Sequence, residues 1–179
     1  MTTLPVAGGA VELRPAVADG LPALVALLAD DPLGSTREGA GDSEAELAPY
    51  RRAFALLDAD PAHLLLVAVD GGAPVGTFQL SFVPGLARRG ALRGQLEAVR
   101  VRADHRGRGL GAAMIGWAIE EARRRGCALV QLTTDKRRPD AHRFYAGLGF
   151  VASHEGLKLA LEAAPAATPS RRPPPDAGS

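Results

Sequence analysis

Three alternating glycines interleaved with two arginines are the feature of this sequence that most strongly indicates chemistry. The run is Arg106-Gly107-Arg108-Gly109-Leu110-Gly111. Backbone N–H groups at the start of a helix have no intrahelical acceptor, and the helix dipole adds partial positive charge there. Glycine lets the backbone approach an anion closely and adopt positive φ, and the arginines add full charges. The run therefore predicts a phosphate site at a helix N-terminus.

The segments on either side of this turn are predicted to hold it in place. Residues 95–102 have the alternating, β-branched pattern of a strand. Residues 110–125 carry apolar side chains at helical spacing and end at Gly126, a residue type favoured just past a helix. Residues 128–134 return as a strand, and the preferred right-handed crossover makes it parallel to the first.

The same turn carries a resemblance to a known family. Arg106-x-x-Gly109-x-Gly111 matches the Arg/Gln-x-x-Gly-x-Gly/Ala signature of the GCN5-related N-acetyltransferases (GNAT). Further along, ALVQLTT and then DAHRFYAGLGF are similar to the family's fifth strand and the helix that follows it. The resemblance covers residues 63–161 well and the N-terminal third only in layout.

This resemblance implies acetyl-CoA as co-substrate and no metal. The residues that would hold its pyrophosphate are Arg106, Gly107, Arg108, Gly109, Leu110, Gly111 and Ala112. The pantetheine arm would follow the strand backbone at Val99, Arg100 and Val101. Relatives often carry Asn three residues before the alanine of the later helix; here that position is Arg138, which either meets the cofactor phosphates or is solvated.

Acetyl transfer from a thioester to an amine needs a base for the amine and an acid for the leaving thiolate. Glu97 is the candidate base, because strand alternation puts it on the same face as Val99, close to the acetyl position of the family. In the alternative interpretation, Glu97 is a surface carboxylate paired with an arginine. Tyr145 is the candidate acid, matching a tyrosine that in many relatives faces the CoA sulfur. In the alternative interpretation, Tyr145 is a core tyrosine packed beside Phe144 and Phe150.

The order of elements predicts an α/β (α+β) fold. For residues 1–162 we expect a single GNAT-type domain, with a mixed, mostly antiparallel sheet of about seven strands flanked by about four helices. Its parallel pair is 95–102 with 128–134. Ser43 and Glu46 form a capping-box signature at the start of one helix.

Three further segments complete this reading. Residues 30–42 are polar and rich in helix breakers, which predicts a long, lid-like loop. Residues 150–153 and 157–161 are expected to form a terminal hairpin. Residues 163–179 contain five prolines and no large apolar side chain, so we expect a disordered tail.

Composition sets the broad class. The chain has 179 residues, a net charge of +1 and 46% hydrophobic residues, which is ordinary for a globular protein. No apolar run reaches the roughly 18 residues needed to span a bilayer, and we see no signal-peptide pattern. Cys127 is the single cysteine, so we expect no intrachain disulfide and a cytoplasmic location. The four histidines are scattered without the spacing of zinc ligands.

The most favoured function is transfer of an acetyl group to a primary amine by direct attack in a ternary complex. Early acidic residues and Glu97 would suit a cationic acceptor such as an aminoglycoside, a polyamine, or a lysine or N-terminal amine of a protein. A small molecule suits the chain better than a peptide. We expect neither a nucleic acid partner, because arginines lack interleaved aromatics, nor a membrane partner. Relatives commonly dimerise, so a homodimer is expected although no residue fixes an interface.

Two other classes compete with this reading. Gly107-x-Gly109-x-x-Ala112 fits the loose dinucleotide-binding fingerprint of an oxidoreductase. However, the preceding strands are joined as hairpins, and too little chain follows to complete a doubly wound half-domain. The second competitor is a GNAT-fold module that binds acyl-CoA without turnover. Within the acetyltransferase class, a protein N-acetyltransferase is the alternative to an enzyme that acts on small molecules.

Overall fold

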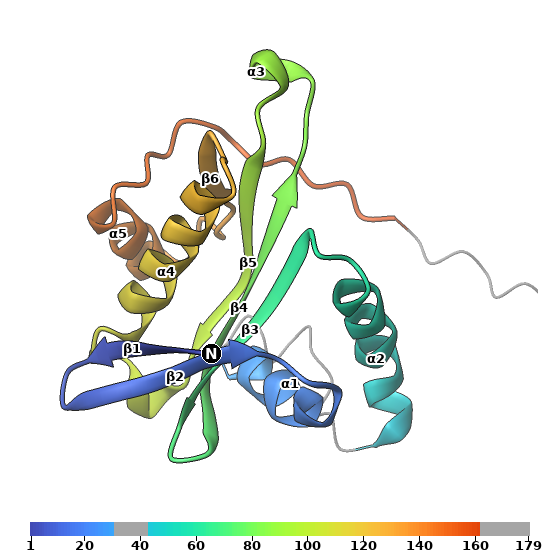
Figure 1. Cartoon of the computed structure of the whole chain (residues 1–179), viewed down its shortest axis with the longest axis vertical. Helices are drawn as coiled ribbons and strands as arrows, with labels where there is room; N and C mark the ends of the chain where they lie inside the picture. Colours follow the sequence, from blue (N-terminus) through green and yellow to red (C-terminus); the bar gives the residue numbers. More distant parts are fainter. Residues whose placement is uncertain (31–42, 162–179) are drawn as a thin grey trace, which may run out of the picture.

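A single six-stranded sheet separates two layers of helices in the computed structural model of the chain, which describes residues 1–30 and 43–161 (Figure 1). The strands lie side by side in chain order: β1 (Thr2–Val6), β2 (Gly9–Pro15), β3 (His63–Asp70), β4 (Ala73–Val83), β5 (Arg93–Val101) and β6 (Leu129–Leu132). All neighbours are antiparallel except β5 and β6, which are parallel. The predicted mixed sheet and its parallel pair are therefore confirmed.

Helices cover both faces of this sheet, with α1 and α2 on one side and α4 and α5 on the other (Figure 1). They are α1 (Leu21–Ala29), α2 (Glu44–Asp58), α3 (Ala87–Gly90), α4 (Leu110–Arg124) and α5 (Pro139–Gly147), with 3-10 turns η1 (Ala18–Gly20) and η2 (Ala103–His105). The predicted cap of α2 is present, since Ser43 Oγ accepts a hydrogen bond from the Glu46 N–H at 3.2 Å. Helix α4 is followed, as predicted, by Gly126 at φ 77°.

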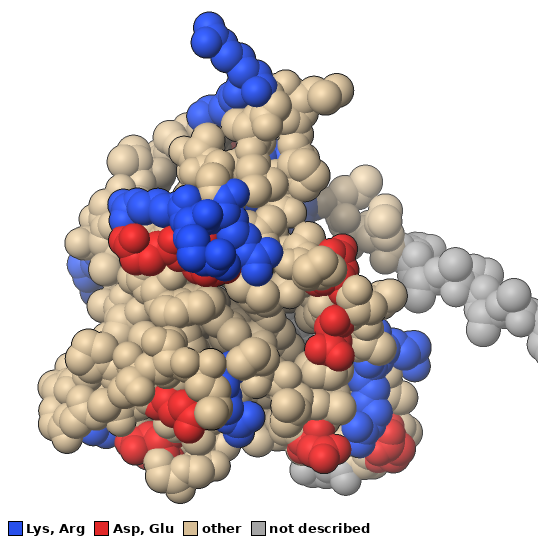
Figure 2. Space-filling view, viewed as in Figure 1, with Lys and Arg blue, Asp and Glu red and all other residues tan. Residues whose placement is uncertain are grey.

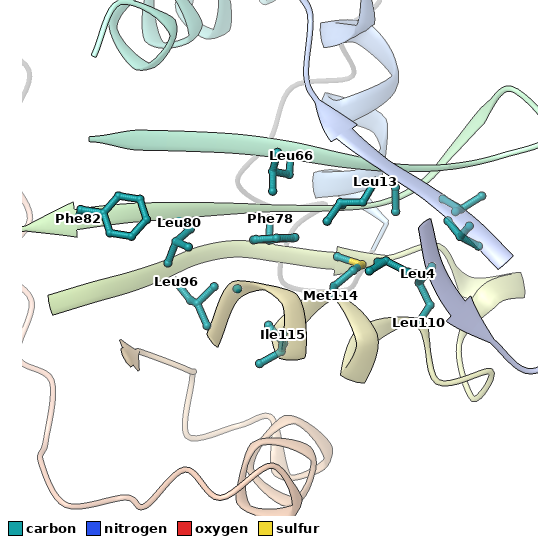
Figure 3. Packing of buried hydrophobic residues seen from close by; sticks show 14 residues of the cluster. Leu4, Leu13, Leu66, Phe78, Leu80, Phe82, Leu96, Leu110, Met114 and Ile115 are labelled. Carbon is teal, nitrogen blue, oxygen red and sulfur yellow. The ribbon is translucent and has the colours of Figure 1, made fainter. Parts of the chain in front are cut away.

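The larger core lies between the sheet and α4 (Figure 3). On β4, Phe78, Leu80 and Phe82 point to this side, where Met114 and Ile115 of α4 meet them. Each buried side chain of this size contributes roughly 1.5–3 kcal/mol. Strand alternation then puts the intervening residues of β4 on the side of α1 and α2. The core thus fixes which face of the sheet carries the polar side chains.

Charged side chains on one face form local pairs. Figure 2 shows Lys and Arg atoms at the projecting β4–β5 loop and, lower down, a second group beside acidic atoms. At the end of α4, Arg124 and Arg125 lie 2.6 and 2.8 Å from Glu121, and Arg123 pairs with Glu120. Arg125 also lies 4.1 Å above the Phe82 ring. The arginine-rich end of this helix is therefore tied into the fold by ion pairs and a cation–π contact.

The terminal segments differ from the sequence-based expectation. The described residues form six strands, not seven, because residues 150–161 do not form the predicted hairpin: Val151 and Leu157 are 81% and 95% exposed and belong to no strand. Conversely, β1 pairs with β2 as a hairpin that was not predicted. There are five α-helices in the described ranges, the additional one being the four-residue α3. The predicted tail and almost all of the predicted loop 30–42 lie outside the described residues.

Gly76 on β4 allows the close approach of α4, which gives a test of this packing. A Cβ at Gly76 would lie 2.9 Å from Met114 Sδ and 3.1 Å from the Arg100 carbonyl oxygen. The methionine can move but the strand backbone cannot, so Gly76→Val should lower the free energy of unfolding by about 1–3 kcal/mol. Gly116→Ala, in the exposed middle of α4 with open space around it, should raise it by about 0.5–1 kcal/mol. Urea denaturation measures both, and a neutral Gly76→Val would contradict the packing described.

Candidate functional site

The glycine turn joins η2 to α4 in the conformation that its sequence predicts. Gly107 and Gly109 have φ values of 74° and 83°, in the left-handed region that favours glycine. Gly109 is the N-cap of α4 and provides no capping side chain. The first intrahelical bond of α4 is from the Ala113 N–H to the Gly109 carbonyl, at 3.0 Å. The N–H groups of the first turn are therefore oriented for an external acceptor, as a phosphate requires.

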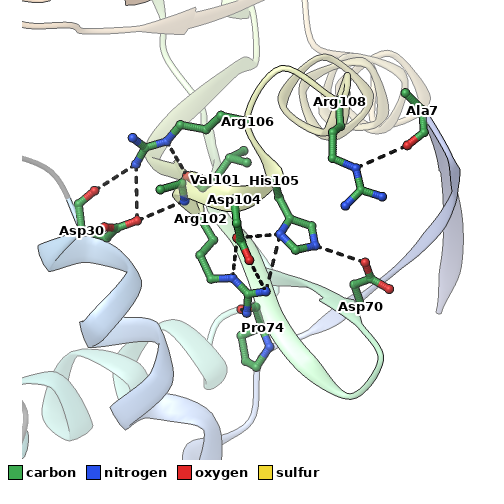
Figure 4. A network of polar contacts seen from close by, with 11 residues as sticks. Ala7, Asp30, Asp70, Pro74, Val101, Arg102, Asp104, His105, Arg106 and Arg108 are labelled. Carbon is green, nitrogen blue, oxygen red and sulfur yellow. Dashed lines mark hydrogen bonds and ion pairs between the residues drawn. The ribbon is translucent and has the colours of Figure 1, made fainter.

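Arg106 and Arg108 connect this turn to distant parts of the chain (Figure 4). Arg106 donates to the Val101 carbonyl at 2.9 Å and to the Asp30 carbonyl, at the end of α1, also at 2.9 Å. Arg108 Nε donates to the Ala7 carbonyl at 3.3 Å, and the Ala7 N–H donates back to the Arg108 carbonyl at 2.9 Å. The two arginines therefore brace the turn against α1 and the β1–β2 hairpin as well as contributing positive charge.

A buried histidine braces the turn from a third direction (Figure 4). His105 is only 8% exposed; its Nδ1 lies 2.7 Å from Asp104 Oδ1 and its Nε2 lies 3.1 Å from Asp70 Oδ2. Arg102 donates to both oxygens of Asp104, at 2.7 and 3.0 Å. Hydrogen bonds from Arg102 and then His105 hold the pKa of Asp104 well below its ordinary range. Sequence reasoning missed this cluster, because the contact from Asp70 comes from the β3–β4 turn.

Strand β5 contains a bulge that changes which side chains share a face. Ala98 has φ 54°, and the register moves from Gln79↔Glu97 to Thr77↔Arg100, so that two residues of β5 lie opposite one residue of β4. The expectation that Glu97 and Val99 share a face is therefore wrong. Val99 packs toward the α4 core, whereas Glu97 lies on the opposite face.

Beyond this bulge, the edge of β5 that faces β6 is open. The two strands pair only from Arg93↔Leu129 to Leu96↔Leu132, where β6 ends, while β5 continues to Val101. Within the described residues, the backbone of 97–101 thus has no partner strand on this side. Unpaired strand edges bind extended ligands through backbone hydrogen bonds. The gap leads along β5 to the glycine turn.

The carboxylate of Glu97 is exposed and held in orientation by amides. Gln131 donates to Gln95 at 2.7 Å, and Gln95 donates to Glu97 Oε1 at 2.9 Å. These three residues come from β5 and β6, on the side of α1 and α2. An exposed carboxylate that is oriented in this way can accept a proton or bind an ammonium group.

Tyr145 lies on α5, on the opposite side of the gap from the Glu97 face. Its ring packs edge-on against Phe144 and Phe150, with centroids 5.1 and 5.7 Å away. Burial raises the pKa of Tyr145, and nearby Arg138 and Arg100 oppose this increase. Helix α5 comes close to the start of α4, since a Cβ on Gly111 would lie 3.3 Å from the Phe144 ring. Tyr145 thus packs with the aromatic residues of the core, as one of the two sequence-based readings expects. Its role as the acid stays a prediction.

The described residues include no group of three or more His, Cys, Asp or Glu side chains arranged to hold a metal ion. In the same ranges, no helix has the length and apolar character needed to cross a membrane.

Comparisons with known proteins find a family, related sequences and a related structure. Residues 23–150 match the acetyltransferase (GNAT) family. The chain is 33% identical over 119 residues to an aminoalkylphosphonate N-acetyltransferase of Salmonella typhimurium, covering 66% of this chain and 77% of that protein. It is 35% identical to a probable glucosamine 6-phosphate N-acetyltransferase of Oryza sativa, over 55% of this chain and 59% of that protein. A Bacillus halodurans structure described as a transcriptional regulator has a TM-score of 0.80 and 46% identity, over 84% of this chain and 99% of that chain.

The Asp104 cluster predicts a pH-dependent contribution to stability. A carboxylate whose pKa is depressed by folding stabilises the protein above its unfolded value of about 3.9, and this contribution is lost as pH falls through the folded value. Asp104→Asn should therefore lower the melting temperature at neutral pH, and the difference from wild type should shrink as pH falls below about 4. Asp140→Asn, which removes an exposed pair with Arg143, is the control with little expected effect. A pH-independent difference for Asp104→Asn would contradict the ion-pair account.

Proposed function

Because the chain belongs to the GNAT acetyltransferase family, we propose that it is an acetyl-CoA-dependent N-acetyltransferase acting on a primary amine of a small molecule. One observation carries this proposal: the gap beside β5 has the glycine turn at one end, with Glu97 and Tyr145 on either side of it. A homodimer and a cytoplasmic location stay predictions.

The turn and the strand edge fit two adjoining parts of acetyl-CoA, the pyrophosphate and the pantetheine arm. Residues 106–112 offer backbone N–H groups and two arginines to the pyrophosphate. The backbone of Val99, Arg100 and Val101 can pair with the amides of the pantetheine arm in the gap. Arg138, at the N-cap of α5, supplies positive charge near Tyr145. The site chemistry needs no metal, since the co-substrate itself supplies the activated acyl group.

The proposed reaction is a direct transfer. The amine nitrogen forms a bond to the acetyl carbon as the carbon–sulfur bond breaks, so an ammonium substrate and acetyl-CoA give the amide, the CoA thiol and one proton. Glu97, directly or through one water, takes the proton that makes the amine nucleophilic. Holding both reactants in the same gap supplies a large part of the rate, because their translational and rotational entropy is already lost when they bind.

Tyr145 is proposed to donate its hydroxyl proton to the leaving sulfur. Burial keeps the phenol protonated, so the proton is present when the thiolate forms. The tyrosine then recovers a proton from the newly formed amide nitrogen, directly or through solvent, which restores the starting state. Its position between Phe144 and Phe150 limits the motion of the ring and so keeps the hydroxyl in place.

A module that binds acetyl-CoA without turnover is the second candidate. It is favoured by the 46% identity to a protein described as a transcriptional regulator. Release of CoA in the presence of primary amines separates the two candidates, because a binding module gives none.

Tyr145→Phe tests the assignment of the acid. The variant keeps the aromatic packing but removes the proton, so kcat should fall by about 10²-fold or more while the affinity for acetyl-CoA is retained. Steady-state CoA release and acetyl-CoA titration measure the two quantities. Phe144→Leu, which changes a neighbouring ring without removing a proton donor, is the matched control and should lower kcat less. An unchanged kcat in Tyr145→Phe would exclude this residue as the acid.

A further inference from the structure

The β5 bulge places a cation and an anion side by side on the acceptor face of the sheet. We propose that the acceptor is an amine that also carries a phosphonate or phosphate group, with Glu97 binding the ammonium and the Arg100 side chain binding the phosphorus oxyanion. This inference rests on the proposed acetyltransferase function and names the class of its acceptor.

The juxtaposition follows from strand register. In a regular strand, residues 97 and 100 would point to opposite faces. The extra residue at Ala98 changes this, so that Glu97 lies opposite Gln79 and Arg100 opposite Thr77. Gln79 and Thr77 are two positions apart on one strand and share a face, at a separation of about 7 Å. Glu97 and Arg100 therefore lie on that same face, about one side-chain repeat apart.

Glu97 has the chemistry to bind an ammonium group. The amides of Gln131 and Gln95 fix its Oε1 at 2.9 Å from Gln95 Nε2, while the carboxylate stays exposed. The same carboxylate can hold the ammonium and then remove its proton. Glu97 alone, however, would accept any amine, so discrimination must come from a second group.

Arg100 is that second group. Its Nη1 donates to the Val99 carbonyl at 2.9 Å, which holds the half-buried side chain beside β5. Its charge reaches Tyr145, where it opposes the increase in the tyrosine pKa. The hydrogen bond to the Val99 carbonyl holds the guanidinium beside the part of β5 that β6 leaves unpaired. Its planar group of N–H donors suits the oxygens of phosphate and phosphonate.

Arg93 is the other arginine of β5 on this face, but it is too far away. It lies four positions before Glu97 in the regular part of the strand, which corresponds to about 13 Å along β5. A short aminoalkyl chain bound at Glu97 cannot reach that distance. Of these two arginines of β5, Arg100 is therefore the one that can contact a phosphorus group close to the amine.

The two curated relatives support this class of acceptor. One is named for aminoalkylphosphonates and the other for glucosamine 6-phosphate, and both names combine an amine with a phosphorus oxyanion. Their shared chemistry matches the pair of charges on this face.

Steady-state kinetics with four amines tests the proposal. The amines are 2-aminoethylphosphonate, phosphoethanolamine, ethanolamine and n-propylamine. Wild type should have a higher kcat/KM for the first two amines than for the last two. Whichever of the first two has the higher kcat/KM shows whether the site prefers a phosphonate or a phosphate. Arg100→Gln should lower kcat/KM by about 10- to 100-fold for these two, because a charged hydrogen bond is lost. For ethanolamine and n-propylamine the loss should be at least several-fold smaller, because they carry no oxyanion; the part of the loss that all four amines share reports the effect of the Arg100 charge on Tyr145.

Three further variants make the result specific. Glu97→Gln should lower kcat/KM for all four amines, because the ammonium site is common to them. Arg100→Lys should retain part of the preference for the phosphorus compounds, since charge remains without the planar donors. Arg123→Gln, at the far end of α4, is the matched control and should change nothing. Acetyl-CoA binding to Arg100→Gln, measured by titration, checks that the variant is folded.

The results that would overturn the proposal are of two kinds: some contradict only the acceptor class, and others contradict the acetyltransferase function itself. Equal losses for all four amines in Arg100→Gln, or a wild type that prefers ethanolamine or n-propylamine, would contradict the acceptor class alone. No CoA release with these four amines, but release with another primary amine such as a polyamine, would likewise contradict the acceptor class alone. No CoA release with any primary amine would contradict the acetyltransferase function on which the inference rests.

Discussion

The β5 bulge at Ala98 is the constraint on which the rest of the site depends. A positive φ at alanine costs roughly 1–2 kcal/mol, and this conformation is retained because β4 pairs with β5 on both sides of it. The bulge separates the apolar side of Val99 and Val101 from the polar side of Glu97 and Arg100. It also occurs where β6 ends. Within a few residues, β5 therefore loses its pairing with β6 and its side chains change the face to which they point.

The glycine turn depends on a second constraint, which is support from outside the turn. Its backbone N–H groups can bind an anion only if the turn keeps its conformation and no other acceptor of the chain occupies them. Arg106, Arg108 and His105 connect it to the end of α1, the β1–β2 hairpin and the β3–β4 turn respectively. These contacts come from chain segments far apart in the sequence, so the phosphate site is a product of the whole fold rather than of its local motif.

Sequence reasoning succeeded where one local signal determines the structure. The glycine turn, helix α4 and the Ser43 cap each have such a signal, and the structure confirms them as local features. The bulge has none, because alanine does not indicate positive φ as glycine or asparagine would. For that reason, strict period-two alternation predicted that Glu97 and Val99 share a face, whereas they lie on opposite faces. The contact of His105 with Asp70 joins positions 35 residues apart and could only come from the fold.

The C-terminal segment shows a different limit. Leu157, Leu159 and Leu161 alternate like strand residues, yet all are 85% exposed or more and belong to no strand. Alternation indicates a strand only where a sheet edge and an apolar surface are available to receive it. The roles of Glu97, Tyr145 and the turn residues follow from the resemblance and the geometry together, and they stay proposals.

Calorimetric titration of acetyl-CoA tests the central claim most directly. Wild type should bind, and Gly109→Glu should not, because it places a carboxylate against the proposed pyrophosphate site. Gly126→Glu is the matched control: its φ of 77° is close to the 83° of Gly109, and it lies at the opposite end of α4 with open space around it. It should suffer the same backbone strain and still bind. No binding to wild type, or equal binding by Gly109→Glu, would contradict the assignment of this turn to acetyl-CoA.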